Sequence, residues 1–149
     1  MKASRLIFTL LLASSVAVVQ LAAQQTKADQ KPIEEVKVKA EAGGAKSQVE
    51  LGRRYDKGEG VMKDHAEAAK WYLKAAEQNY VDAQFNLGMC YEQADPGTED
   101  WAEVYKWLSL AARQGHEGAK KFMTVLESKL MTPEQIAQGQ KRAREFKPR

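Results

Sequence analysis

The chain has 149 residues, of which 44% are hydrophobic and 29% charged, and this is enough for one modest domain. Its 23 basic and 20 acidic residues give a net charge of +3, without the concentrated basic field of a nucleic-acid-binding protein. The single cysteine, Cys90, excludes a disulfide within the chain. We expect its side chain to be sheltered between helices as a small apolar group, with intermolecular pairing or a reactive thiol as the alternatives.

Residues 1–23 have the layout of a secretory signal peptide. Lys2 and Arg5 precede an apolar run over residues 6–19, and small residues follow up to Ala23. This run of 14 residues is shorter than the roughly 20 that a membrane-spanning helix needs. We therefore expect cleavage after Ala23 and a periplasmic or secreted protein, with an uncleaved membrane anchor as the alternative.

Residues 24–45 read as a flexible linker. They are rich in Gln, Lys, Glu, Ala and Gly, and they carry too few large apolar side chains to offset the entropy of ordering. One island interrupts this composition, because Ile33, Val36 and Val38 could add a strand to the sheet edge of another protein. A solvated tether is the simpler expectation for the segment.

The rest of the chain predicts helices, and its capping residues fix where they begin. Asp64 and Glu67 form a capping pattern that Asp100 and Glu103 repeat. Gly115 is placed to end a helix in the left-handed conformation. The helices are expected over residues 46–57, 64–78, 81–93, 100–114, 117–129 and 132–146. Short turns between them predict an all-α fold of antiparallel neighbours.

Two stretches, residues 47–82 and 83–118, overlay without a gap and share twelve identities in 36 columns. A unit this short cannot bury its apolar face alone, so the copies must stack. Glycine and alanine allow helices to approach closely, and tryptophan and tyrosine supply large packing surfaces. The main structural positions are Leu51, Gly52, Tyr55, Trp71, Ala75 and Ala76 in the first copy and Leu87, Gly88, Tyr91, Trp107, Ala111 and Ala112 in the second.

These positions resemble the Sel1-like repeat family, a relative of the tetratricopeptide repeat. The resemblance covers residues 46–146 and implies an α-solenoid of stacked antiparallel helix pairs, with a partial third repeat and a capping helix over residues 119–146. The second copy departs from the pattern at residues 94–97, where Pro96 replaces a glycine-rich turn.

The resemblance implies a non-enzymatic adaptor that binds a partner protein on the concave face of the repeat array. A membrane-associated structural component of envelope assembly is the alternative. The sequence contains no recognisable catalytic constellation, and its two histidines are not spaced to bind a metal with Cys90. We therefore expect no cofactor, no metal and no nucleic-acid partner. The candidate partner-binding residues are Glu50, Arg53, Arg54, Asn86, Met89 and Gln93.

The basic C-terminal stretch, residues 141–149, is a second candidate surface. It could contact an anionic membrane or an acidic partner. Cations at the C-terminus of a helix also complement the helix dipole, and this is the simpler interpretation.

Overall fold

The computed structural model describes residues 32–92 and 100–149, and residues 33–149 form one compact unit. The expected signal peptide, Gln93 and the proline-containing turn at residues 94–97 lie outside the described residues. The elements are α2 (Ile33–Glu41), α3 (Ala45–Lys57), α4 (His65–Glu77), α5 (Val81–Glu92), α6 (Trp101–Arg113), α7 (Glu117–Val125), the π-helix η1 (Leu126–Leu130) and α8 (Pro133–Glu145). The described part contains no strand, so the all-α prediction is confirmed.

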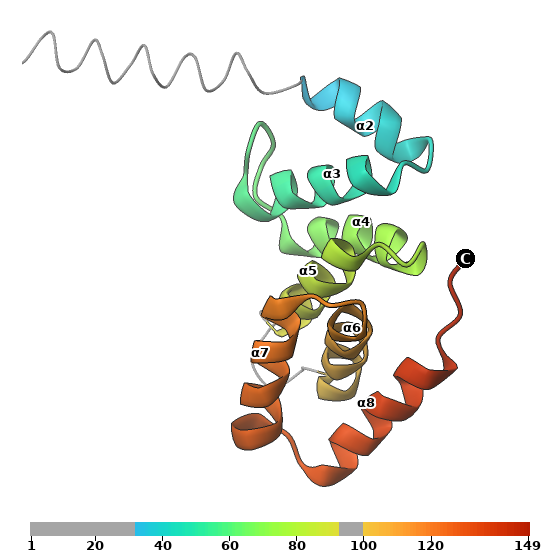
Figure 1. Cartoon of the computed structure of the whole chain (residues 1–149). Helices are drawn as coiled ribbons and strands as arrows, with labels where there is room; N and C mark the ends of the chain where they lie inside the picture. Colours follow the sequence, from blue (N-terminus) through green and yellow to red (C-terminus); the bar gives the residue numbers. More distant parts are fainter. Residues whose placement is uncertain (1–31, 93–99) are drawn as a thin grey trace, which may run out of the picture. The chain divides into compact units, whose positions relative to one another are not determined.

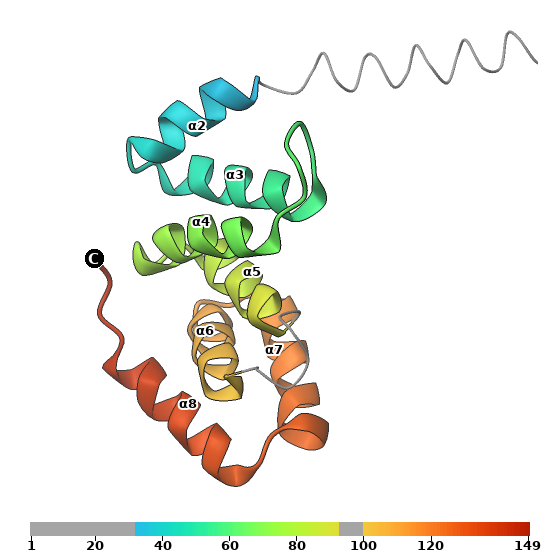
Figure 2. The same cartoon turned by 180° about the vertical axis from the view of Figure 1, so that it is seen from behind.

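Consecutive helices from α2 to α7 pack on one another in chain order (Figure 1). Helix α8 breaks this order by packing back on α6. It lies on the side of α6 away from α7, as both views show (Figure 2). Helix α6 is therefore covered from three directions, by α5, α7 and α8.

The expected caps are present at three helix starts. The Asp64 carboxylate accepts a hydrogen bond from the Glu67 backbone N–H at 2.9 Å, and Asp100 does the same for Glu103 at 3.2 Å. Thr132 and Gln135 form a complete capping box at the start of α8. His116 caps α7, because its Nδ1 accepts from the Ala119 N–H at 3.1 Å, a role that the sequence did not reveal.

The expected flexible linker is wrong over residues 33–41, which form helix α2. Val36 and Ala40 are 3% and 1% exposed and pack in one cluster with Leu51 and Trp71. The apolar island therefore covers the first repeat of this chain and does not extend as a strand. Helical spacing of Ile33, Val36 and Ala40 puts these residues on one face, which gives the short helix a surface to bury.

The two helix-interior glycines of the repeats mark points of close helix approach, as their recurrence predicts. A Cβ at Gly52 would lie 2.8 Å from the ring of Tyr72, and one at Gly88 would lie 2.8 Å from Cγ of Leu108. Both values are too short for any real contact, so only glycine fits at these two crossings.

The repeated tryptophans lie in the core as expected, at 6% exposure for Trp71 and 1% for Trp107. Each has a lysine ammonium over its ring, Lys74 at 3.9 Å and Lys106 at 4.2 Å from the ring centroid. Their indole N–H groups are buried and, within the described chain, have no hydrogen-bond acceptor. The tryptophans therefore contribute through apolar area and cation–π contacts rather than through polar bonds.

A ladder of glutamines joins successive repeats. The Gln84 side-chain amide donates to the Ala76 carbonyl at 3.4 Å and to Asn79 Oδ1 at 3.0 Å, and Gln114 donates to Gln84 Oε1 at 2.9 Å. The first repeat has the same arrangement, because Gln48 donates to the Ala40 carbonyl at 3.1 Å. Each buried glutamine is thus satisfied by the preceding helix and the following turn.

The same spacing extends back into α2. Left-handed backbone occurs at Gly43, Asn79 and Gly115, each 36 residues from the next. Ala40 and Ala76, the two carbonyls that accept from the glutamine ladder, are also 36 residues apart. Helix α2 therefore takes the place of the second helix of a preceding repeat and covers α3 as α4 covers α5.

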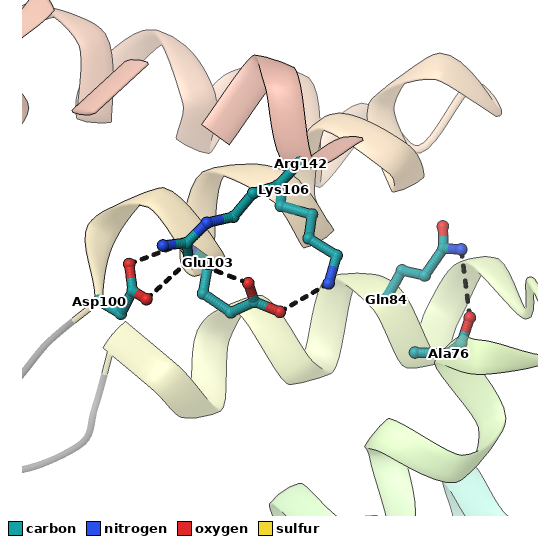
Figure 3. A network of polar contacts seen from close by, with 6 residues as sticks. All are labelled: Ala76, Gln84, Asp100, Glu103, Lys106 and Arg142. Carbon is teal, nitrogen blue, oxygen red and sulfur yellow. Dashed lines mark hydrogen bonds and ion pairs between the residues drawn. The ribbon is translucent and has the colours of Figure 1, made fainter. Parts of the chain in front are cut away.

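Ion pairs fasten α8 to the start of α6. Nη1 of Arg142 lies 2.6 Å from Oδ2 of Asp100 and 3.1 Å from Oε2 of Glu103, and Lys106 pairs with Glu103 at 2.7 Å (Figure 3). Burial acts to raise the pKa of Asp100, but hydrogen bonds from Arg142 and from the Glu103 backbone outweigh it and lower this pKa. The Asp100 carboxylate therefore stabilises the folded chain when ionised.

We expect this ion pair to make stability depend on pH in the acid range. Because the folded-state pKa of Asp100 is lowered, its contribution is present above the unfolded value, near pH 4, and is lost as pH falls through the folded value. Arg142→Gln should lower the free energy of unfolding at pH 7 by about 1 kcal/mol or less, since both partners are partly exposed. At pH 2 the variant and the parent should differ little.

Urea unfolding at the two pH values measures this effect. The matched control is Lys141→Gln, because Lys141 is on the same helix but holds only a 3.9 Å pair with Glu145. An Arg142→Gln deficit of equal size at pH 7 and pH 2 would show that the side chain acts through packing alone.

Candidate protein-binding surface

Glu50 and Arg53, two of the expected partner-binding residues, form an ion-pair network on α3. Arg53 donates from Nη2 and Nε to the two Glu50 oxygens at 2.9 and 3.1 Å, and it also pairs with Glu59 in the following turn. Burial acts to raise the pKa of Glu50, but hydrogen bonds from Arg53 and Arg54 outweigh it and hold this pKa below its ordinary value. About a third of each side chain, 34% for Glu50 and 35% for Arg53, is exposed to a partner.

Arg54 does not belong to an accessible surface, and its inclusion among the contact residues is wrong. Its side chain is 4% exposed, and its Nε donates to Glu50 Oε1 at 2.9 Å. In the overlay of the two repeats Arg54 shares its column with Cys90, which was itself expected to be sheltered. Glu50 is therefore the counter-ion of this buried guanidinium.

On α5 the corresponding positions are Asn86 and Met89, which share the columns of Glu50 and Arg53. Both are partly buried, whereas Leu87 and Gly88 between them are fully covered. Gln93, the last expected contact residue, lies outside the described residues. These two columns of the first helix in each pair are thus partly open and carry different side chains in each repeat.

Cys90 follows Met89 on α5 and is a free, partly buried thiol that packs against the core. Burial, with a smaller contribution from the Asp56 carboxylate, raises the pKa of Cys90 to about 12. The thiolate is therefore scarce at neutral pH, and the sheltered interpretation fits better than a reactive nucleophile. Burial likewise raises the pKa of its neighbour Tyr72.

Within residues 32–92 and 100–149, no group of three or more His, Cys, Asp and Glu side chains is placed to hold a metal ion. His65 instead pairs with Asp56 at 2.7 Å, and His116 stacks on Phe85 with ring centroids 4.2 Å apart. No helix in these ranges is both long and apolar enough to cross a bilayer.

A family model described as Sel1 repeat matches residues 45–80 and 81–116. These two spans correspond to the pairs α3–α4 and α5–α6, each running from the start of the first helix to the turn after the second. The chain is a Sel1 repeat protein. Members of this family generally act as scaffolds for protein interactions and are typically not catalytic.

Two solved structures resemble this Sel1 repeat protein. The protective antigen c5321 of uropathogenic Escherichia coli, described as displaying an SLR fold, is 27% identical with a TM-score of 0.69 over 76% of this chain and 24% of that one. A Sel1 repeat protein from Oxalobacter formigenes is 31% identical with a TM-score of 0.63 over 88% of this chain and 56% of that one. The chain thus spans about a quarter and just over half of these two proteins. Comparison with curated proteins gave no match.

Proposed function

We propose that this Sel1 repeat protein is a non-enzymatic adaptor of the bacterial cell envelope that holds a partner protein on the inner face of its helix array. The supporting observation is a contrast between neighbouring columns of α3 and α5. The buried columns of Leu51 with Leu87 and Gly52 with Gly88 are identical in the two repeats, whereas the adjoining partly open columns of Glu50 with Asn86 and Arg53 with Met89 differ.

This contrast distinguishes the residues that pack the helices together from the residues that a partner can reach. The buried columns repeat because each must fit the same helix crossing. The open columns place Glu50 and Arg53 beside one another on α3 but the neutral Asn86 and Met89 on α5. A partner that lies across both helices would therefore meet an ion-paired half and an apolar, amide-bearing half. Methionine adapts its shape to a partner surface, which suits such a contact.

Met89→Glu is expected to disrupt partner capture. A carboxylate in the apolar half would have to be desolvated when a partner covers it, so crosslinked capture from the native envelope should fall by about tenfold or more. Met62→Glu is the matched control, since Met62 is 89% exposed in the turn before α4. Thermal melts must show both variants folded; equal capture by both would place the contact elsewhere.

The envelope location has its own test. Mass spectrometry of the native protein should find a mature N-terminus at Gln24, as the predicted cleavage after Ala23 requires. An intact Met1 in the membrane fraction would instead favour the membrane-associated structural role.

A further inference from the structure

A groove of about 330 Å³ lies between the C-terminal halves of α6 and α8, away from the α3–α5 surface. Leu110, Ala143 and Phe146 supply its apolar part, and the first two are only 8% and 4% exposed. An adjoining hollow shares Arg113, Ala143 and Arg144 and adds Ser109 and Gln140. The last residues of the chain close one end, where the Arg149 backbone N–H donates to the Glu77 carbonyl at 2.8 Å.

Two arginines of this groove are unpaired. Arg113 and Arg144 are exposed, and neither has an ion pair or hydrogen bond to any described residue. Three other cations of the basic tail are engaged, since Arg142 pairs with Asp100, Lys141 with Glu145 and Arg149 with Glu77. The fourth, Lys147, has no partner among the described residues but lines neither hollow. Among the described residues that line the two hollows, none is acidic. The groove therefore carries positive charge without a counter-ion of its own.

The polar edge of the groove offers one donor and one acceptor. Asn79 Oδ1 accepts from Gln84 and Gln114, both at 3.0 Å, and the Gln114 amide also donates to Gln84 at 2.9 Å. These bonds hold the two side chains in place and leave the Asn79 amide N–H and the Gln114 side-chain carbonyl without a partner in the described chain. A peptide backbone, which presents one N–H and one C=O per residue, complements such a pair.

We propose that this groove binds an acidic peptide segment of a partner protein. Carboxylates of the segment pair with the Arg113 and Arg144 guanidiniums, whose planar forks suit bidentate contacts. An apolar side chain of the segment covers Leu110 and Phe146, and its backbone meets Asn79 and Gln114. The surface belongs to α6, α8 and the turn after α4, so it is additional to the proposed contact on α3 and α5.

The chemistry favours a peptide over a membrane or a nucleic acid. Both of those partners are bound through extended arrays of cations. Here three of the five tail cations are neutralised by carboxylates of the chain, and of the other two only Arg144 lines the groove. It joins Arg113 of α6 there beside an apolar floor. A combination of two charges, a fixed amide pair and an apolar strip is typical of recognition of a short extended segment.

Binding can be measured by fluorescence anisotropy with a panel of short labelled peptides, each with several Asp or Glu residues around one Leu or Phe. The matched panel replaces every acid by Asn or Gln. At about 0.15 M salt we expect acidic members to bind with Kd below about 1 mM and the neutral panel to bind at least tenfold more weakly. Failure of every acidic peptide to bind would overturn the proposal.

The double variant Arg113→Gln/Arg144→Gln should raise the Kd for the acidic peptides by about tenfold or more. Lys121→Gln/Lys129→Gln is the control, because it removes the same charge from exposed positions on α7 and η1. Equal losses in the two variants would mean a non-specific charge effect and would contradict the groove. Met89→Glu should leave peptide affinity unchanged, which separates this site from the α3–α5 surface. Binding of anionic vesicles but not of peptides would assign the groove to membranes instead.

Discussion

Trp107→Ala should lower the free energy of unfolding by about 3–5 kcal/mol, the range for removing a fully buried tryptophan from a core. Trp107 is 1% exposed, and its ring lies edge-on to Phe146 with centroids 5.3 Å apart. It therefore joins α6 to the end of α8 as well as filling the second repeat. Denaturant unfolding followed by circular dichroism measures the change.

Two companion variants separate packing from other causes. Met62→Ala, at a side chain that is 89% exposed, should change stability by no more than about 0.5 kcal/mol. Trp107→Phe keeps an aromatic ring and removes an N–H that has no acceptor in the described chain, so it should lose clearly less than Trp107→Ala. A Trp107→Ala chain as stable as its parent would contradict the packing of α8 on α6.

Gly139→Val is the second substitution with a large expected effect. A Cβ at this position would lie 2.7 Å from Cβ of Tyr105 and 3.0 Å from the carbonyl oxygen of Ala102. Because one of these atoms is backbone, no side-chain rotation relieves the clash and α8 must move off α6. We expect a loss of about 1–3 kcal/mol, with more if Phe146 leaves Trp107.

Ala137→Val is the matched control, since it adds the same β-branched side chain to an exposed position two residues earlier on α8. It should cost only the small loss of helix propensity, about 0.5 kcal/mol. Limited trypsin digestion gives an independent measure, because a displaced α8 can unwind and the peptide bonds after Lys141 and Arg144 then become susceptible to cleavage. Equal stability and equal digestion of the two variants would rule out close packing at Gly139.

Helix starts and ends could be predicted from sequence because their causes are local. Asp64, Asp100 and Thr132 each cap the helix for which they were assigned, and Gly115 has the left-handed φ of 92° that a helix-ending glycine needs. The repeated glycines and tryptophans were also predictable, since a column that recurs in two copies must satisfy the same packing twice. The fifth predicted helix instead divides into α7 and the π-helix η1 after Val125, which no local signal indicated.

Features that depend on contacts between distant segments were not predictable in the same way. Helix α2 was missed because its composition resembles a tether, although Ala40 and Gly43 already stood 36 residues before Ala76 and Asn79. Arg54 was assigned to the surface because a charged side chain is usually exposed. Its matching position in the second repeat, Cys90, already indicated a sheltered site. Arg113 and Arg144 became a possible site only when the fold brought α8 alongside α6.

The glutamine ladder restricts how a chain of this kind can change in length. Each glutamine bonds to the neighbouring repeat, so adding or removing a single residue inside the helices that carry these side chains would leave the buried Gln48 or Gln84 amide without its partner. A complete repeat of 36 residues, by contrast, adds its own glutamine and also supplies the groups to which the glutamine of the next repeat bonds. We therefore expect the helical array to lengthen or shorten by whole repeats more readily than by single residues inside its helices.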